Sequence, residues 1–171
     1  MSSDHQPQRD LHSFLNLKIM TWNIEGLKRN VFNLKHFLET HSPDLVFLSE
    51  PQFFSFDLAR YMAHLGNTYC AEVNSDDKQD SELPQISNKS YGGTMVIWKR
   101  SLDMHITVYP VETSSFLPIV LSPPGSPVSV HICLYLPTSG QEASFVEQVT
   151  LLQMVIDEIK EKYQGCIINL R

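Results

Sequence analysis

The sequence predicts an α/β protein of the α+β type, in which short strands are combined with a few amphipathic helices. Three observations support this prediction. A strand–helix–strand pattern occupies residues 17–48, segments of strand length recur between 94 and 135, and a long helical period fills 142–163. The 171 residues suit one domain, and the hydrophobic fraction of 42% is typical of a globular protein rather than a disordered one.

The first strand and helix are predicted from an apolar run followed by a helical spacing. Leu17–Trp22 has the length and composition of a strand. Asn30 is placed as the N-cap of the next helix, because its side chain could accept a hydrogen bond from a free backbone N–H group. Val31, Leu34 and Leu38 recur at helical spacing after it.

Turn residues separate the elements that follow. The Ser42-Pro43-Asp44 turn ends the first helix, and a strand is expected at Leu45–Leu48. A short helix is expected at 57–65, with Gly66 just past its end, because glycine adopts the left-handed backbone that often terminates a helix. A strand at Thr68–Val73 comes next.

The second half of the chain is predicted to contain mostly strands before a final helix and strand. The helix at Glu142–Tyr163 carries one apolar stripe, and Gly165 ends it before a strand that begins at Cys166. The stripe consists of Phe145, Val149, Leu152, Ile156, Ile159 and Tyr163. The expected strands before this helix are Thr94–Trp98, Met104–Tyr109, Phe116–Leu121 and Val128–Tyr135, with a turn at 122–126.

Two segments lack the periodicity of ordered structure. Residues 1–16 are polar and are predicted to be a flexible leader, which leaves 17–171 as the structured domain. Residues 74–90 form the longest irregular stretch after the leader and are predicted to be a disordered loop. Acidic residues outnumber lysines in this loop, so it is poorly suited to contact DNA.

The composition of the chain indicates the cellular compartment in which it acts and the partners that it binds. No apolar run approaches the ~20 residues of a membrane helix, and the first residues lack the apolar core of a secretory signal. The three cysteines are widely separated, which disfavours a disulfide framework and a zinc cluster. These observations predict an intracellular protein, in the nucleus or the cytoplasm, that does not bind membranes. The net charge of −6 disfavours tight, unaided binding to DNA.

Two carboxylates follow strands that a helix connects. Glu25 lies after the first predicted strand, and Glu50 lies after the strand at 45–48. The carboxyl ends of both strands in a strand–helix–strand unit emerge on one edge of the sheet, where open α/β folds bind ligands. Glu25, Glu50 and the amide of Asn23 would there supply oxygen ligands suited to Mg²⁺. Either glutamate taken singly is more often a solvated side chain at a strand end.

Four blocks of sequence, in this order, resemble the endonuclease/exonuclease/phosphatase superfamily over about 17–168. They are Trp22–Leu27, Leu48–Glu50, Tyr91–Trp98 with its paired glycines, and Leu134–Gly140. The last block contains the Tyr-x-Pro pattern of the abasic-site and LINE-type retrotransposon endonucleases, whereas the lipid and inositol phosphatases usually carry Thr-His there. The resemblance implies an incomplete two-layer β-sandwich flanked by helices, built from two similar halves, with nucleic acid (DNA) as the partner.

The resemblance implies roles for matching residues only. Glu50 would ligate Mg²⁺, or Mn²⁺ in its place, and Glu25 and Asn23 would fix the metal and its water. Tyr135 would point its hydroxyl at the scissile phosphate, since a phenol can donate to phosphoryl oxygens. The alternative for Tyr135 is a strand-end aromatic residue with a packed ring and a solvated hydroxyl.

The chain departs from the family pattern at two places. The family most often has Asp where Glu25 stands, so the longer side chain would change its reach. After the long helix the family continues with a Gly-Asp-x-Asn element and later with an Asp-His pair, whereas here only three residues follow Ile168. The residues given therefore suggest a C-terminally truncated member, 17–171 being the N-terminal part of the domain.

No histidine or cysteine is expected to complete the site. His131 is separated from Tyr135 by four residues of strand, roughly 13 Å, and we interpret it as a histidine on a half-buried strand. His105 is likewise placed on a strand face, and Cys133 is interpreted as a core residue.

Three functional hypotheses stay open. The first is a truncated endonuclease-like domain with a partial Mg²⁺ site and little or no hydrolysis. The second is a non-catalytic binding module that pairs with another chain, or with itself, through a sheet face that the absent half leaves exposed. The third is a phosphatase or an RNA nuclease of the same superfamily, although Tyr135 argues against the phosphatases.

Overall fold

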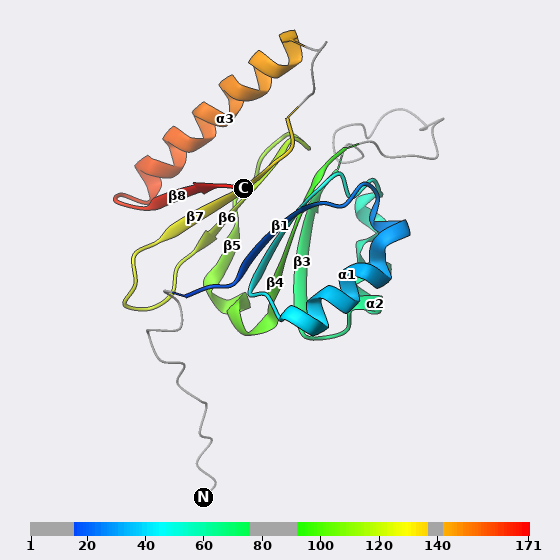
Figure 1. Ribbon diagram of the computed structural model, residues 1–171. Coiled ribbons are helices and arrows are strands. Elements are labelled where there is room, and N and C mark those ends of the chain that lie inside the picture. The colour runs from blue at the N-terminus through cyan, green and yellow to red at the C-terminus, as the bar shows by residue number, and fades with distance from the viewer. Residues whose placement is uncertain (1–15, 76–91, 137–141) are drawn as a thin grey trace, which may run out of the picture.

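The protein's computed structural model describes residues 16–75, 92–136 and 142–171 (Figure 1). In the described residues the chain alternates strands with three α-helices and two short 3₁₀ helices. In chain order the elements are β1 (Ile19–Asn23), α1 (Leu27–His41), β2 (Leu45–Ser49), η2 (Ser55–Asp57), α2 (Leu58–Leu65), β3 (Tyr69–Asn74), β4 (Thr94–Lys99), η4 (Arg100–His105), β5 (Ile106–Val108), β6 (Phe116–Leu121), β7 (Ser129–Leu134), α3 (Glu142–Lys162) and β8 (Ile167–Leu170).

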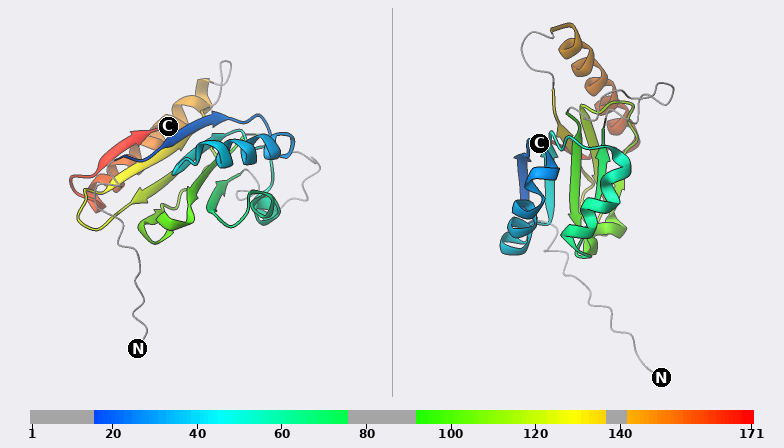
Figure 2. Two further views of the ribbon diagram at one scale, coloured as in Figure 1. Left: turned by 60° about the horizontal axis from the view of Figure 1, so that its bottom comes forward. Right: turned by 90° about the vertical axis from the view of Figure 1, so that its right-hand side faces the viewer.

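The strands form two four-stranded sheets, which confirms the predicted fold class. The first sheet has the order β1-β2-β4-β3, and the second has the order β5-β6-β7-β8. In each sheet one pair is parallel, β1 with β2 and β7 with β8, and a helix connects the two strands of that pair. Helices α1 and α2 lie on one side of the molecule and α3 lies on the other (Figures 1 and 2).

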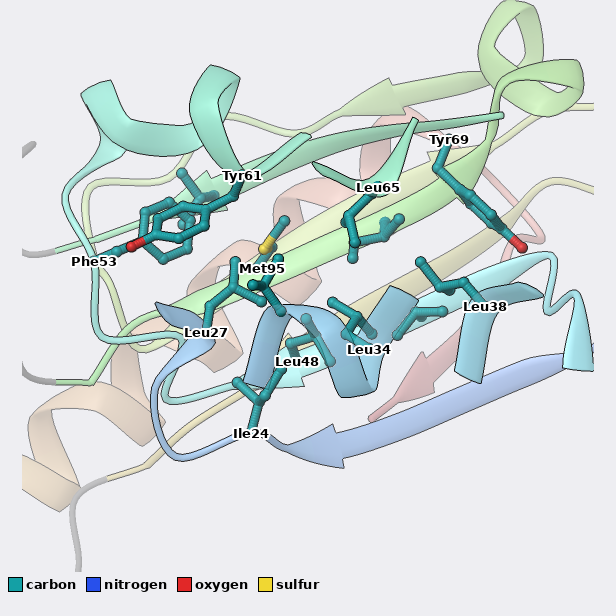
Figure 3. Packing of buried hydrophobic residues seen from close by; sticks show 14 residues of the cluster. Ile24, Leu27, Leu34, Leu38, Leu48, Phe53, Tyr61, Leu65, Tyr69 and Met95 are labelled. Carbon is teal, nitrogen blue, oxygen red and sulfur yellow. The ribbon is translucent and has the colours of Figure 1, made fainter. Parts of the chain in front are cut away.

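The outer face of the first sheet is covered by α1 and α2. The buried residues of α1 are Leu27, Val31, Leu34 and Leu38, one stripe at helical spacing that packs against Leu48 and other sheet residues (Figure 3). Fully burying each such side chain contributes about 2 kcal/mol to the stability of the fold.

The inner faces of the two sheets pack against each other. Leu45 and Phe47 of β2 contribute to this core together with Leu117 and Ile119 of β6, and all four are almost fully buried. Alternate residues of β6, including Phe116 and Val120, pack beneath α3 on the opposite face. Strands that are buried on both faces have continuous apolar sequences. This is why the strands β2 and β6 could be predicted accurately.

The expectation of an exposed sheet face is wrong for the described residues. Each sheet packs one face against the other sheet and the other face against helices. The edge strands β1, β3, β5 and β8 each have only one neighbour in the described sheets. The unpartnered elements are therefore strand edges, and self-association stays a prediction.

Helix α1 begins before the residue that we placed as its N-cap. The residue preceding the helix is Gly26, and no side chain caps this end. Asn30 lies inside the first turn, where its side-chain Nδ2 donates to the carbonyl oxygens of Ile24 at 2.8 Å and Gly26 at 3.3 Å. Asn30 therefore fixes the β1–α1 turn from within the helix.

The strand predicted at Met104–Tyr109 is correct only for its central residues. Met104 and His105 belong to η4, and β5 covers only Ile106–Val108. Leu102 is buried in η4, and Asp103 accepts a hydrogen bond of 2.8 Å from the indole N–H of Trp98. These tertiary contacts outweigh the local alternation that favoured a strand.

The apolar stripe predicted on α3 is correct only in its C-terminal part. Leu152 and Ile159 are buried against the second sheet, together with Val155, which we did not predict. Phe145 is 43% exposed and Val149 is 39% exposed. The first turns of α3 therefore extend beyond the sheet that the rest of the helix covers.

Most of the two segments predicted to be flexible lies outside the described residues. This holds for 1–15 of the leader and for 76–90 of the loop. Asn74 is described and is a buried residue of β3, so the strand runs into the segment that we predicted to be disordered. Within the described ranges, no helix has the length and apolar character needed to cross a membrane.

Candidate metal centre

The parallel pairing of β1 and β2 brings their carboxyl ends together, as the sequence predicted. Asn23 is paired with Ser49 in the sheet register, so each strand ends at the same level. Beyond this level the Ile24 amide donates to the Ser49 carbonyl oxygen at 3.0 Å, and the Gly26 amide donates to the Glu50 carbonyl oxygen at 2.8 Å. The two turns that carry Glu25 and Glu50 therefore run side by side.

Asn23 connects the two predicted carboxylate residues. Its side-chain Nδ2 donates to Glu50 Oε1 at 2.9 Å, and its Oδ1 accepts a hydrogen bond of 3.2 Å from the backbone amide of Glu25. Both functional groups of the Asn23 amide are thus used to fix the turn of Glu25 relative to the side chain of Glu50.

Three non-glycine residues in these turns have a left-handed backbone. Their φ angles are 47° at Glu25, 53° at Glu50 and 52° at Gln52. Such a conformation costs a non-glycine residue of order 1 kcal/mol, and residues of this kind gather at functional sites. The strained turns therefore support a functional role for this end of the sheet.

Gln52 is a residue of this centre that the sequence analysis missed. Its side-chain Nε2 donates to Glu50 Oε2 at 3.3 Å, and its backbone amide donates to the carbonyl oxygen of Gly92 at 3.4 Å. A long polar side chain two residues after Glu50 was the available signal. Its left-handed backbone, which aims the side chain back at Glu50, could not be read from the sequence.

The paired glycines Gly92 and Gly93 contact the turn after β2 through backbone hydrogen bonds. The Glu50 amide donates to the Gly93 carbonyl oxygen at 3.1 Å. A Cβ on Gly93 would lie 2.8 Å from the carbonyl oxygen of Asn74, and a Cβ on Gly92 would lie 3.2 Å from Cε1 of Tyr135. Both positions therefore depend on the absence of a side chain.

Tyr135 lies at the same end of the sandwich through its contact with Gly92. Its backbone amide donates to the Ser115 carbonyl oxygen at 2.7 Å, just beyond the end of β7. The ring packs over Gly92, whose carbonyl oxygen accepts the Gln52 amide. The described contacts thus join Asn23, Glu25 and Glu50 directly, and Tyr135 contacts Gly92 at the same end of the sandwich. Residues 137–140 of its sequence block lie outside the described residues.

The family to which this chain belongs follows from a comparison with known protein families. The model of the Endonuclease/Exonuclease/phosphatase family matches residues 20–168. The chain belongs to this family. No curated protein matches the chain.

Solved structures from this fold resemble the chain at low sequence identity. The 3′ phosphatase NExo from Neisseria, bound to a product DNA hairpin, is 13% identical with a TM-score of 0.59, over 90% of this chain and 56% of that chain. The AP endonuclease LMAP from Leishmania major is 21% identical with a TM-score of 0.56, over 90% of this chain and 50% of that chain. TDP2 from C. elegans is 17% identical with a TM-score of 0.55, over 89% and 45%. The chain spans about half the length of these family members, whose likeness establishes the fold.

The Glu50 carboxylate has the chemistry to bind one side of a divalent cation. Each oxygen of the Glu50 carboxylate accepts one amide hydrogen bond, and an ionised carboxylate has about four lone-pair positions, so lone pairs stay available. Mg²⁺ keeps several waters and commonly binds through one or two carboxylates. In the described ranges no group of three or more His, Cys, Asp and Glu side chains gathers into a larger ligand set.

His131 does not belong to this centre. It is 4% exposed in the core between the sheets, and its ring stacks on Phe47 at a centroid distance of 6.0 Å. Burial, together with the charge of Arg171, lowers the pKa of His131 to about 4. The residue is therefore more deeply buried than we predicted. Cys133 is in the same core, as expected, and burial raises the pKa of its thiol to about 12.

Proposed function

We propose that the chain carries the metal-holding and phosphate-facing part of a Mg²⁺-dependent DNA endonuclease. The observation that carries this proposal is the hydrogen bond between Asn23 and Glu50 at the joined ends of two parallel strands. A carboxylate held in this way at a sheet edge is a suitable ligand for a hard cation. Mn²⁺ is expected to replace Mg²⁺.

The roles proposed for the side chains follow from their chemistry. Glu50 would bind the cation, and Glu25 and Asn23 would hold the cation and its water shell in place. When bound, the cation would neutralise charge that develops on the phosphoryl oxygens and help to generate the nucleophile. The hydroxyl of Tyr135 would donate to a phosphate oxygen of the substrate.

DNA is the proposed substrate class. The DNA hairpin bound to the NExo phosphatase supports DNA as a ligand of this fold. The Tyr135 block resembles the abasic-site and LINE-type retrotransposon branch, which favours an endonuclease over the lipid and inositol phosphatases. A panel of abasic DNA, single-stranded RNA and 3′-phosphorylated DNA would separate these substrates.

The polypeptide of residues 1–171 is expected to bind the cation and to hydrolyse little or no DNA. The Gly-Asp-x-Asn element that the family resemblance implies would position the attacking water, and residues 1–171 contain no Gly-Asp dipeptide. The aspartate that the resemblance assigns to positioning the attacking water therefore has no counterpart among residues 1–171.

Two measurements on the purified 171-residue protein test the proposal. Titration with Mn²⁺, monitored by electron paramagnetic resonance, should give one site, and Glu50→Gln should weaken it by more than ten-fold, about 1.4 kcal/mol. An unchanged affinity in Glu50→Gln would overturn the metal site. Plasmid and abasic-DNA nicking in Mg²⁺ should not exceed that of Glu50→Gln. Robust nicking that this substitution abolishes would show instead that the polypeptide is a complete endonuclease.

A non-catalytic binding module is the second candidate function. It is favoured by β8, an end strand of its sheet on which Ile167 is 56% exposed and Leu170 is 52% exposed. A strand edge without a second neighbour among the described strands is a template for another strand. Light scattering that finds only monomers across the micromolar range would count against pairing with a second copy.

A further inference from the structure

The Glu50 carboxylate is held by two amide groups that come from different turns. Asn23 Nδ2 donates to Oε1 at 2.9 Å from the end of β1, and Gln52 Nε2 donates to Oε2 at 3.3 Å from the turn after β2. We propose that Gln52 is a positioning residue, which sets the orientation of the Glu50 carboxylate for a divalent cation. This inference rests on the proposed function, since it concerns the same cation.

Two donors restrict a carboxylate more than one donor does. With Asn23 alone, one oxygen would be fixed and the other would be free to turn about the Cγ–Cδ bond. The donor from Gln52 fixes the second oxygen and therefore the plane of the group. An amide N–H group donates and cannot itself bind a cation, so both amides orient Glu50 and leave its other lone pairs available.

The backbone around Gln52 holds its side chain in this position. Its amide donates to the Gly92 carbonyl oxygen at 3.4 Å, and its φ angle is 52°. The side-chain oxygen Oε1 lies 3.3 Å from the place where a Cβ on Gly26 would stand. Gly26 thus provides the space in which the Gln52 carboxamide turns its nitrogen towards Glu50.

The alternative is that Gln52 only stabilises its turn, and two substitutions separate the alternatives. Gln52→Met keeps the length of the side chain and the strained backbone but removes the donor. Gln52→Gly removes the donor and also relieves the left-handed strain of order 1 kcal/mol. Gln153→Met is the matched control, because Gln153 Nε2 donates to Asp157 Oδ1 at 2.9 Å on an exposed face of α3.

The readouts are the dissociation constant for Mn²⁺, from electron paramagnetic resonance of the free ion, and the thermal unfolding midpoint without metal. Both Gln52 variants should bind Mn²⁺ about ten-fold more weakly, as is typical when a partner of a metal-binding carboxylate is lost. Their unfolding midpoints should stay within a few degrees of the wild-type value. Gln153→Met should change neither quantity.

A double substitution tests whether Gln52 acts through Glu50. In a Glu50→Gln background, Gln52→Met should cause no further loss of Mn²⁺ affinity. Wild-type affinity in Gln52→Met, or a further loss in the Glu50→Gln background, would overturn the positioning role alone. An affinity that Glu50→Gln leaves unchanged, or no measurable Mn²⁺ binding by the wild type, would overturn the metal site of the proposed function as well.

Discussion

Gly93 and Asn74 lie so close together that a Cβ on Gly93 would stand 2.8 Å from the Asn74 carbonyl oxygen. This close approach joins the end of β3 to the start of β4, next to the point where Gly93 accepts the Glu50 amide. The geometry of the Glu50 turn therefore depends on a position where any side chain would force backbone atoms apart.

Gly93→Ala is expected to destabilise the fold by about 2–4 kcal/mol, because a left-handed backbone and a steric clash act together. Urea unfolding followed by circular dichroism would measure the change. Gly165→Ala is the control, since Gly165 also has a positive φ of 75° but nothing within 4 Å of its Cβ position. It should cost only the backbone strain, about 1 kcal/mol. Equal losses at both positions would contradict the close-approach explanation.

Asn23→Ala should weaken Mn²⁺ binding by about ten-fold with little loss of stability, because Asn23 is exposed and contacts Glu50 and the Glu25 amide. Isothermal titration calorimetry would give the affinity, and thermal unfolding would give the stability. Asn33→Ala, which removes an exposed hydrogen bond of 3.2 Å to Asn30, is the control and should leave Mn²⁺ affinity unchanged. A drop in affinity for both variants would indicate a general rather than a local effect.

His131 should make the stability of the protein depend on pH. Its pKa falls from 6.5 to about 4 in the folded state, so the folded protein favours the neutral ring. The resulting stability is present above pH 6.5 and is lost as the pH falls from 6.5 towards 4. At about 1.4 kcal/mol per pKa unit, the largest possible contribution is about 3 kcal/mol.

His131→Leu tests this prediction. The ring Nδ1 has no hydrogen-bond partner in the described part of the chain, and Nε2 lies 3.2 Å from Ser129 Oγ, so leucine gives up one hydrogen bond and removes the titratable group. Urea unfolding at pH 7.5 and pH 5 should show a smaller loss of stability in the variant than in the wild type. The same loss in both proteins would show that other groups carry the acid sensitivity.

Cys133 should resist thiol reagents while the protein is folded. It is 1% exposed, its Sγ–H donates to the Leu48 carbonyl oxygen at 3.4 Å, and burial raises the pKa of its thiol to about 12. The thiolate is the reactive form, so labelling requires the two sheets to separate. Mass spectrometry after brief exposure to a maleimide should find Cys166, which is only half-buried, modified before Cys133. Faster labelling of Cys133 would contradict the inter-sheet packing described here.

From the sequence alone we could predict those strands and helices that are determined by a pattern within a few neighbouring residues. The strand Phe116–Leu121 was predicted to the residue, because a short apolar run followed by a turn rich in Pro and Gly is typical of a strand buried on both faces. Glu25 and Glu50 could be placed together because a strand–helix–strand unit brings both strand ends to one edge.

Features set by tertiary contacts could not be predicted in this way. The start of α1 is set by the Asn30 side chain, which donates back to the turn before the helix. Met104 and His105 follow the buried Leu102 into η4 in spite of their strand-like pattern. Gln52 reaches Glu50 only because its backbone is left-handed, and nothing in its neighbouring residues indicates that conformation.

The left-handed backbone of Glu25, Glu50 and Gln52 also affects which segments of the protein unfold locally first. Strain of a few kcal/mol concentrated in two adjacent turns makes these turns a unit of low local stability on a rigid sheet. Their backbone amides should exchange with solvent deuterium earlier than those of β2 and β4. A cation that binds only the closed turns would slow this exchange in proportion to its occupancy, so deuterium uptake would report binding where no reaction can be measured.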